Sequence, residues 1–79
     1  MTFTKQFIKL SKAQGIDYWK EVDSFQNNVT HLKLSKRAIY LIYFEELGNA
    51  YIEDREAKTS AYVNTPQEAV DIVNELLKN

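Results

Sequence analysis

The chain contains 79 residues, no cysteine and a formal net charge of −1. Its length suits one domain spanning residues 1–79, and its 44% hydrophobic content is too high for a disordered segment. The lack of cysteine excludes a disulfide framework and a thiolate metal site. The slightly acidic balance disfavours a protein whose affinity comes from a strongly basic surface.

Residues 4–14 predict a short amphipathic helix. Phe3, Phe7 and Leu10 fall along one stripe at helical spacing, with lysines on the opposite side. Gly15 stands where a helix commonly ends, and the lysines suit the negative end of a helix.

The stretch 16–26 gives the weakest pattern, because helical and alternating spacings both fit its apolar residues. We expect an irregular or short-strand segment that delivers Trp19 to the core. Asn27 and Asn28 predict a turn, since asparagine tolerates the left-handed region better than most residues. Residues 29–34 then predict a strand, and residues 35–37 a turn into the next hairpin.

Residues 38–54 predict a β-hairpin, because Ile, Tyr and Phe flank a turn signal at Gly48-Asn49. A two-residue loop at Gly48-Asn49 mixes apolar and charged residues on both faces. A three-residue loop over residues 46–48 sorts the pairs by polarity, since Phe44 then lies opposite Ala50. Gly48 supplies the left-handed residue that such a loop needs. We therefore expect the three-residue loop.

This register divides the hairpin into two faces, of which one must belong to the core. One face carries Tyr40, Ile42, Phe44, Ala50 and Ile52. The other face carries Leu41, Tyr43 and Tyr51. The second face is either covered by another element or exposed as an aromatic patch. Because aromatic residues are enriched at interface centres, we predict Leu41, Tyr43 and Tyr51 as partner-binding residues.

The last part of the chain predicts a strand over residues 60–64 and then a strongly marked helix. Thr65 and Glu68 form a capping box, with Pro66 at the first helical position. An apolar stripe follows at helical spacing, formed by Ala69, Ile72, Val73, Leu76 and Leu77. We expect this stripe to pack on the hairpin face that carries Ile42, Phe44 and Ile52.

Together these elements predict the α+β class: a small antiparallel sheet of three to four strands with an N-terminal and a C-terminal helix, in the order α-β-β-β-β-α. This order is similar to that of double-stranded-RNA-binding domains, which place a lysine cluster at the start of the last helix. Here the first turn of the last helix contains an acidic residue, Glu68, which would repel phosphate.

The sequence offers little for catalysis. His31 is the single histidine, and Gly15 and Gly48 are explained by a helix end and a turn, so no phosphate-binding glycine loop is expected. The carboxylate pairs Glu45-Glu46 and Glu53-Asp54 could hold a hard cation, but a charged sheet edge is the simpler interpretation. We expect no enzyme activity, no catalytic or metal site and no cofactor.

We therefore expect a small non-enzymatic interaction or regulatory module that binds another protein or itself, as a homodimer. The alternative is a single-stranded nucleic-acid or RNA binder, because residues 1–44 hold seven Lys/Arg against three Asp/Glu. Its candidate patch consists of Lys5, Lys9, Lys12, Lys33, Lys36 and Arg37. Without an apolar export signal or a run of membrane-spanning length, the chain predicts a cytoplasmic protein that does not contact membranes.

Overall fold

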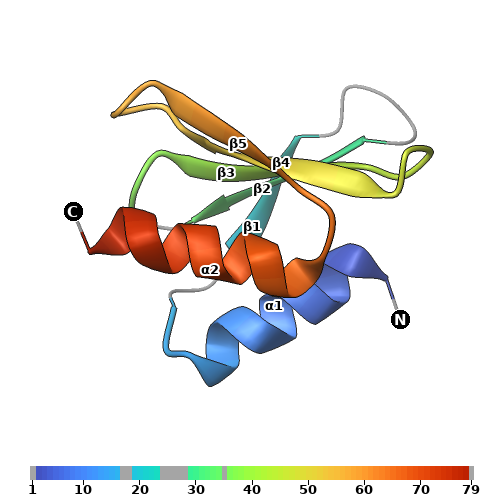
Figure 1. Ribbon diagram of the computed structural model, residues 1–79, viewed down its shortest axis with the longest axis horizontal. Helices are drawn as coiled ribbons and strands as arrows, with labels where there is room; N and C mark the ends of the chain where they lie inside the picture. The colour runs from blue at the N-terminus through green and yellow to red at the C-terminus, as the bar shows by residue number, and fades with distance from the viewer. Residues whose placement is uncertain (1, 17–18, 24–28, 35, 79) are drawn as a thin grey trace.

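The computed structural model describes residues 2–16, 19–23, 29–34 and 36–78. Within them, two helices lie on the same side of one antiparallel sheet (Figure 1). The strands are hydrogen-bonded in chain order, so each strand lies beside the next one along the sequence. The elements are α1 (Phe3–Ala13), β1 (Trp19–Asp23), β2 (Val29–Leu34), β3 (Ile39–Phe44), β4 (Asn49–Asp54), β5 (Thr59–Val63) and α2 (Pro66–Leu77).

The predicted α+β class, with an antiparallel sheet between an N-terminal and a C-terminal helix, is confirmed. The described sheet has five strands, because the weakly patterned stretch 16–26 contributes the edge strand β1. Trp19 on this strand is in the core, as expected, and is 1% exposed. The pairing of β1 with β2 shifts between Glu21 and Asp23. A strand whose pairing shifts in this way lacks a strict two-residue sequence period, which explains the unclear sequence pattern.

Both helices begin at threonine caps. The Thr2 hydroxyl oxygen accepts a hydrogen bond from the Lys5 N–H at 3.3 Å, and the Thr65 hydroxyl oxygen accepts one from the Glu68 N–H at 3.2 Å. The Thr65 hydroxyl also donates to the Glu68 carboxylate at 3.3 Å. The predicted cap at Thr65 is therefore confirmed. Gly15 follows α1 with φ 74°, the left-handed conformation that commonly ends a helix.

The β3–β4 hairpin differs from the prediction by one residue. Its loop spans the four residues 45–48, so the predicted three-residue loop is wrong. Gly48 is left-handed, with φ 70°, and its N–H donates to the Phe44 carbonyl at 2.9 Å. The observed cross-strand pairs include Phe44–Asn49, Tyr43–Ala50, Ile42–Tyr51 and Leu41–Ile52.

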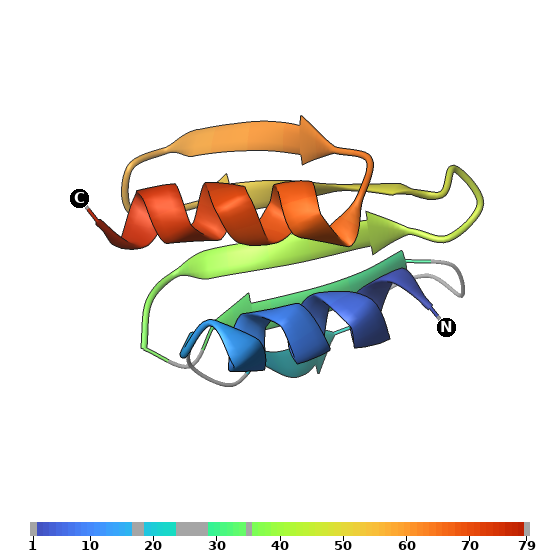
Figure 2. The same cartoon turned by 60° about the horizontal axis from the view of Figure 1, so that its bottom comes forward.

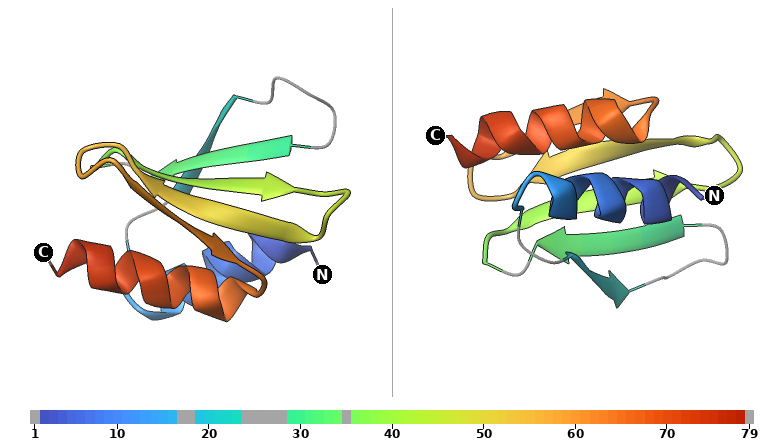
Figure 3. Two further views of the ribbon diagram at one scale, coloured as in Figure 1. Left: turned by 45° about the horizontal axis from the view of Figure 1, so that its top comes forward. Right: turned by 90° about the horizontal axis from the view of Figure 1, so that it is seen from below.

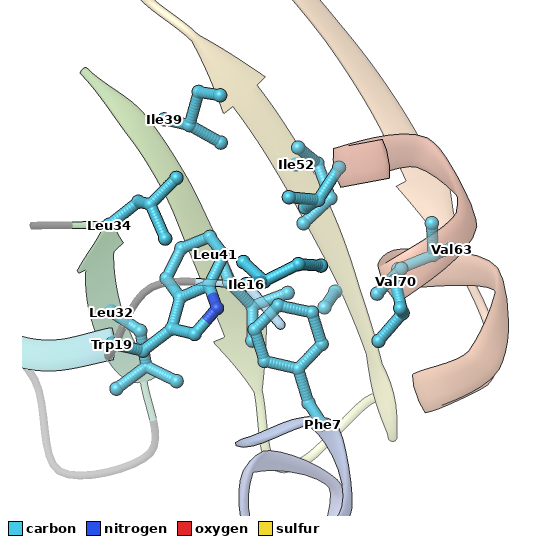
Figure 4. Packing of buried hydrophobic residues seen from close by; sticks show 13 residues of the cluster. Phe7, Ile16, Trp19, Leu32, Leu34, Ile39, Leu41, Ile52, Val63 and Val70 are labelled. Carbon is cyan, nitrogen blue, oxygen red and sulfur yellow. The ribbon is translucent and has the colours of Figure 1, made fainter. Parts of the chain in front are cut away.

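This register places aliphatic side chains of the central strands beneath the helices. Directly paired residues of an antiparallel ladder share a face, so Leu32, Leu41 and Ile52 line up across β2, β3 and β4. The buried cluster consists of Phe7, Ile16, Trp19, Leu32, Leu34, Ile39, Leu41, Ala50, Ile52, Val63, Ala69, Val70 and Val73 (Figure 4). Phe7 meets Trp19 edge to face, with ring centroids 4.8 Å apart.

The packing of α2 corrects the predicted stripe. Val70, which the stripe omitted, is completely buried, whereas Leu77 is 38% exposed. The helix runs alongside β4 and β5 (Figure 2), on the sheet face that carries Ile52. Ile42 and Phe44 point to the opposite face, so the expectation that α2 packs on them is wrong. The cause is the one-residue difference in the hairpin register.

Candidate functional site

The second face of the sheet is covered by neither helix. Figure 3 shows α1 and α2 on the same side of the five strands, with the other side open in the described part of the chain. Side chains alternate along a strand, so the residues between the core positions form this open face. From β2 to β5 its residues are Val29, His31, Lys33, Tyr40, Ile42, Phe44, Asn49, Tyr51, Glu53, Ser60 and Tyr62.

Three aromatic side chains, Phe44, Tyr51 and Tyr62, cross the open face from β3 to β5; we call them the aromatic row. The ring centroids of Phe44 and Tyr51 are 5.7 Å apart with planes inclined at 30°, and those of Tyr51 and Tyr62 are 5.5 Å apart at 59°. Aromatic pairs favour separations of about 4.5–7 Å, so the row is one connected surface. Tyr62, on the edge strand, is 77% exposed.

Ile42 fills the middle of the open face. It pairs with His31 on β2 and with Tyr51 on β4. Although no described helix covers it, Ile42 is only 2% exposed. Neighbouring side chains of the open face must therefore close over Ile42, which makes this face a packed surface rather than a set of separate side chains.

A charged pair borders the aromatic row. The Arg55 guanidinium carbon lies 4.0 Å from the centroid of the Tyr40 ring, within the distance of about 6 Å at which a cation and an aromatic face attract. Arg55 Nε also donates to Glu53 Oε1 at 2.5 Å, and this hydrogen bond raises the pKa of Arg55. Tyr40 and Glu53 thus hold the guanidinium in place while more than half of the Arg55 side chain, 56%, stays exposed.

The middle of the aromatic row is uncharged at neutral pH. Burial raises the pKa of Tyr51 above its usual value, and the negative charge of Glu53 acts in the same direction. The Tyr51 hydroxyl is therefore neutral near pH 7 and can both donate and accept a hydrogen bond.

The three predicted partner-binding residues do not share a face. Leu41 is completely buried beneath the helices, where no partner can reach it. Tyr43 lies on the same side, and its ring stacks on Phe3 of α1 with centroids 4.9 Å apart. Tyr51 is the one member of the group on the open face. The predicted grouping is wrong because a one-residue slip moves the residues of one strand to the other face.

The sequence interpretation missed the other residues of this site. The sequence prediction places Tyr40 and Phe44 on the face opposite Tyr51 and does not include Arg55 or Tyr62 among the binding residues. The signal that identifies them is the loop length. A four-residue loop places Tyr40, Phe44 and Tyr51 on one face, and the alternation of β5 then adds Tyr62.

The alternative basic patch is not gathered on one surface. Lys5, Lys9 and Lys12 are exposed on α1, on the helix side of the sheet. Lys33 belongs to the open face, and Lys36 is exposed in the connection between β2 and β3. The fold thus spreads these lysines over two sides of the molecule.

Arg37, the last member of that patch, has a structural role. Its Nη2 donates to Asp54 Oδ2 at 3.2 Å, and its Nη1 donates to the Leu76 carbonyl at 2.9 Å, near the end of α2. Asp54 is 2% exposed, and its Oδ1 accepts from the N–H groups of Glu56 and Ala57 at 3.1 and 3.2 Å. This network ties the β2–β3 connection, the end of β4 and the last turn of α2 together.

The carboxylates of Glu53 and Asp54 lie on opposite faces of β4, since successive residues of a strand alternate. They do not form the cation pair considered from the sequence. Among residues 2–16, 19–23, 29–34 and 36–78, no three His, Asp or Glu side chains are grouped so that they could hold a metal ion.

No protein-family model, curated protein or solved structure matches this chain. Neither of the helices described above is long and apolar enough to cross a membrane.

Proposed function

We propose that the protein is a non-enzymatic interaction module, acting as a small cytoplasmic accessory or regulatory protein that binds another protein through the open face. The observation that carries this proposal is the aromatic row of Phe44, Tyr51 and Tyr62 on a sheet face that the helices leave uncovered.

The residue types of this face support a protein partner. Tyrosine and arginine are enriched among the residues that dominate binding energy at protein interfaces. Here the rings of Tyr51 and Tyr62 and the guanidinium of Arg55 are held by neighbouring side chains on a hydrogen-bonded sheet. Ordering these groups therefore costs little when a partner binds, which favours affinity.

The open face does not require a strongly charged partner. Arg55 is balanced by Glu53, and from β2 to β5 the open face contains one further lysine, Lys33. Recognition of this surface should come mainly from burial of aromatic area and from a few hydrogen bonds, as in the centre of many protein interfaces.

Single-stranded nucleic acid is a second candidate ligand of the open face, because bases stack on aromatic side chains of open sheets. Nucleic-acid affinity depends strongly on cations along the path of the backbone. The lysines Lys5, Lys9 and Lys12 lie on the other side of the sheet. A protein partner is therefore the better supported proposal.

The test compares tagged wild-type protein with Tyr62→Ser, Tyr62→Phe and Leu47→Ser in affinity capture and then in direct binding measurements with the captured protein. Leu47 is the control, since it is 72% exposed in the β3–β4 loop and lies outside the strands that carry the aromatic row. We expect Tyr62→Ser to weaken binding by about tenfold or more, and Tyr62→Phe and Leu47→Ser to bind like wild type.

The proposal fails if Tyr62→Ser and Leu47→Ser bind the captured protein equally well. It is replaced by the second candidate if a short single-stranded oligonucleotide, added during NMR titration, shifts the signals of the aromatic row in a salt-sensitive way.

A further inference from the structure

β5 leaves one edge of the sheet open. Its residues, Thr59–Val63, pair with β4 on one side, and no described strand pairs with the other side. Thr59, Ser60 and Tyr62 are exposed. An edge of this kind presents unpaired backbone N–H and C=O groups, which can receive another strand.

The pairing pattern shows which backbone groups point outward. The Arg55 N–H donates to the Ala38 carbonyl at 2.9 Å, so this pair forms hydrogen bonds between β3 and β4. Hydrogen-bonded pairs alternate along an antiparallel ladder. Ile52 must then direct its backbone groups toward Ala61 of β5. By the same alternation, the N–H and C=O groups of Ser60 and Tyr62 point away from the sheet.

The β5 edge lacks the sequence and structural features that usually prevent another strand from pairing with it. Edge strands are commonly protected by charged residues, bulges or proline. The other edge strand, β1, has a shift in its pairing between Glu21 and Asp23 and three charged residues in its sequence. β5 contains neither a charged residue nor a proline, and its pairing with β4 is regular.

We propose that β5 pairs antiparallel with β5 of a second copy of this chain, about a two-fold axis at Ala61. Ser60 of each copy then exchanges two hydrogen bonds with Tyr62 of the other copy, so all four outward N–H groups and all four outward carbonyls at these two positions are shared between the two strands. Ala61 faces Ala61 at the axis, in a pair without hydrogen bonds, where the chains approach most closely and a small side chain fits.

The strand is self-complementary in this register. On the helix side, Thr59 lies opposite Val63 of the second copy, and on the open face Ser60 lies opposite Tyr62. No like charges meet, which matters because like charges directly opposite each other destabilise a sheet. A two-fold contact of this type closes after two copies, so it gives a dimer rather than a fibre.

The dimer would also extend the open face. Tyr62 lies at the outer end of the aromatic row and is 77% exposed in one copy. Across the two-fold axis, the rows of both copies would lie on one continuous sheet. The inference itself depends on the backbone edge and not on the proposed partner of the open face, so the two can fail separately.

The experiment is sedimentation equilibrium of the full chain over a concentration series. Wild type should reach about twice the chain mass of 9.2 kDa. Ser60→Pro removes an outward N–H without removing a bond to β4, which proline tolerates on edge strands. It should raise the dimer dissociation constant about tenfold or more, since symmetry removes two hydrogen bonds. Ser60→Ala keeps the N–H and should dimerise like wild type, as should Tyr62→Ser.

A charge exchange separates loss of pairing from loss of folding. Ala61→Lys and Ala61→Glu each place like charges together at the axis, so each variant alone should be monomeric. Their mixture should form the heterodimer. Monomeric wild type at every concentration would overturn the inference. So would a dimer that both Ala61 variants retain, or one whose Ser60 and Tyr62 amides stay unprotected from hydrogen exchange.

Discussion

Of two arginine–carboxylate pairs in this fold, the one with the longer N···O distance should contribute more to stability. Arg37 Nη2 lies 3.2 Å from Asp54 Oδ2, whereas Arg55 Nε lies 2.5 Å from Glu53 Oε1. The longer pair includes a carboxylate that is 2% exposed, and the shorter pair is exposed on the open face. Exposed pairs contribute about 0–1 kcal/mol, whereas breaking a buried pair costs about 3–5 kcal/mol.

We therefore expect Arg37→Met to destabilise the protein by about 2–3 kcal/mol. This value is below the fully buried range because the Arg37 side chain is 26% exposed and Asp54 keeps two backbone donors. Arg37→Met also removes the hydrogen bond to the Leu76 carbonyl. Arg55→Met should cost less than about 1 kcal/mol, and added salt should reduce its effect further.

Urea unfolding measures both changes, with the fluorescence of the single tryptophan, Trp19, as the signal of the core. A double-mutant cycle of Arg37→Met with Asp54→Asn then isolates the coupling between the two side chains. Equal costs of Arg55→Met and Arg37→Met, or a cycle without coupling, would contradict the expected difference between the two pairs.

The two faces of the sheet should respond differently to loss of a tyrosine. Tyr43→Ala should lower the free energy of unfolding in urea by about 2 kcal/mol or more, because the Tyr43 ring packs on Phe3 beneath the helices. Tyr62→Ala should stay within about 0.5 kcal/mol of wild type, because Tyr62 is exposed. Equal costs would contradict the assigned faces. Burial raises the pKa of Tyr51 in the folded protein, so its neutral form contributes stability that is present below the unfolded pKa of about 10 and is lost as the pH rises through the folded value. Tyr51→Phe should therefore lose less stability than wild type above about pH 10, as followed by unfolding at stepped pH, and identical pH profiles would count against this assignment. Neither magnesium, calcium nor short oligonucleotides should raise the melting temperature, and a clear rise with an oligonucleotide would favour the second candidate function.

Local signals in the sequence predict the local features of the fold. Thr65 and Pro66 start α2, Gly15 follows α1, and Gly48 takes the left-handed position in the hairpin loop. Each of these features depends on a few neighbouring residues and on fixed backbone preferences. They hold whatever packs against them, which is why the order of helices and strands could be predicted.

The hairpin register depends on contacts that are distant in sequence. Sorting the hairpin pairs by polarity disfavours the observed register, because that register places Asp54 opposite Ile39 on the core side. Asp54 is tolerated there because Arg37, 17 positions earlier in the chain, donates to it. The polarity of the hairpin alone contains no information about this partner. The error of placing Leu41, Tyr43 and Tyr51 on one face followed directly from the register error.

The aromatic row of the open face has an inner part that packs around Ile42 and an outer member, Tyr62, that is exposed. An antiparallel sheet covered on one side usually turns polar residues to water on the other. Here Ile42 sits on the uncovered side, so Phe44 and Tyr51, on the same and the adjacent strand, have a structural reason to be apolar. Tyr62 has a weaker structural reason, because β4 separates it from Ile42 and its side chain is 77% exposed. Stability alone accounts for an aromatic row that stops at Tyr51. Its continuation onto the exposed edge strand is what points to binding, and Tyr62 is the position where binding and stability can be separated by mutation.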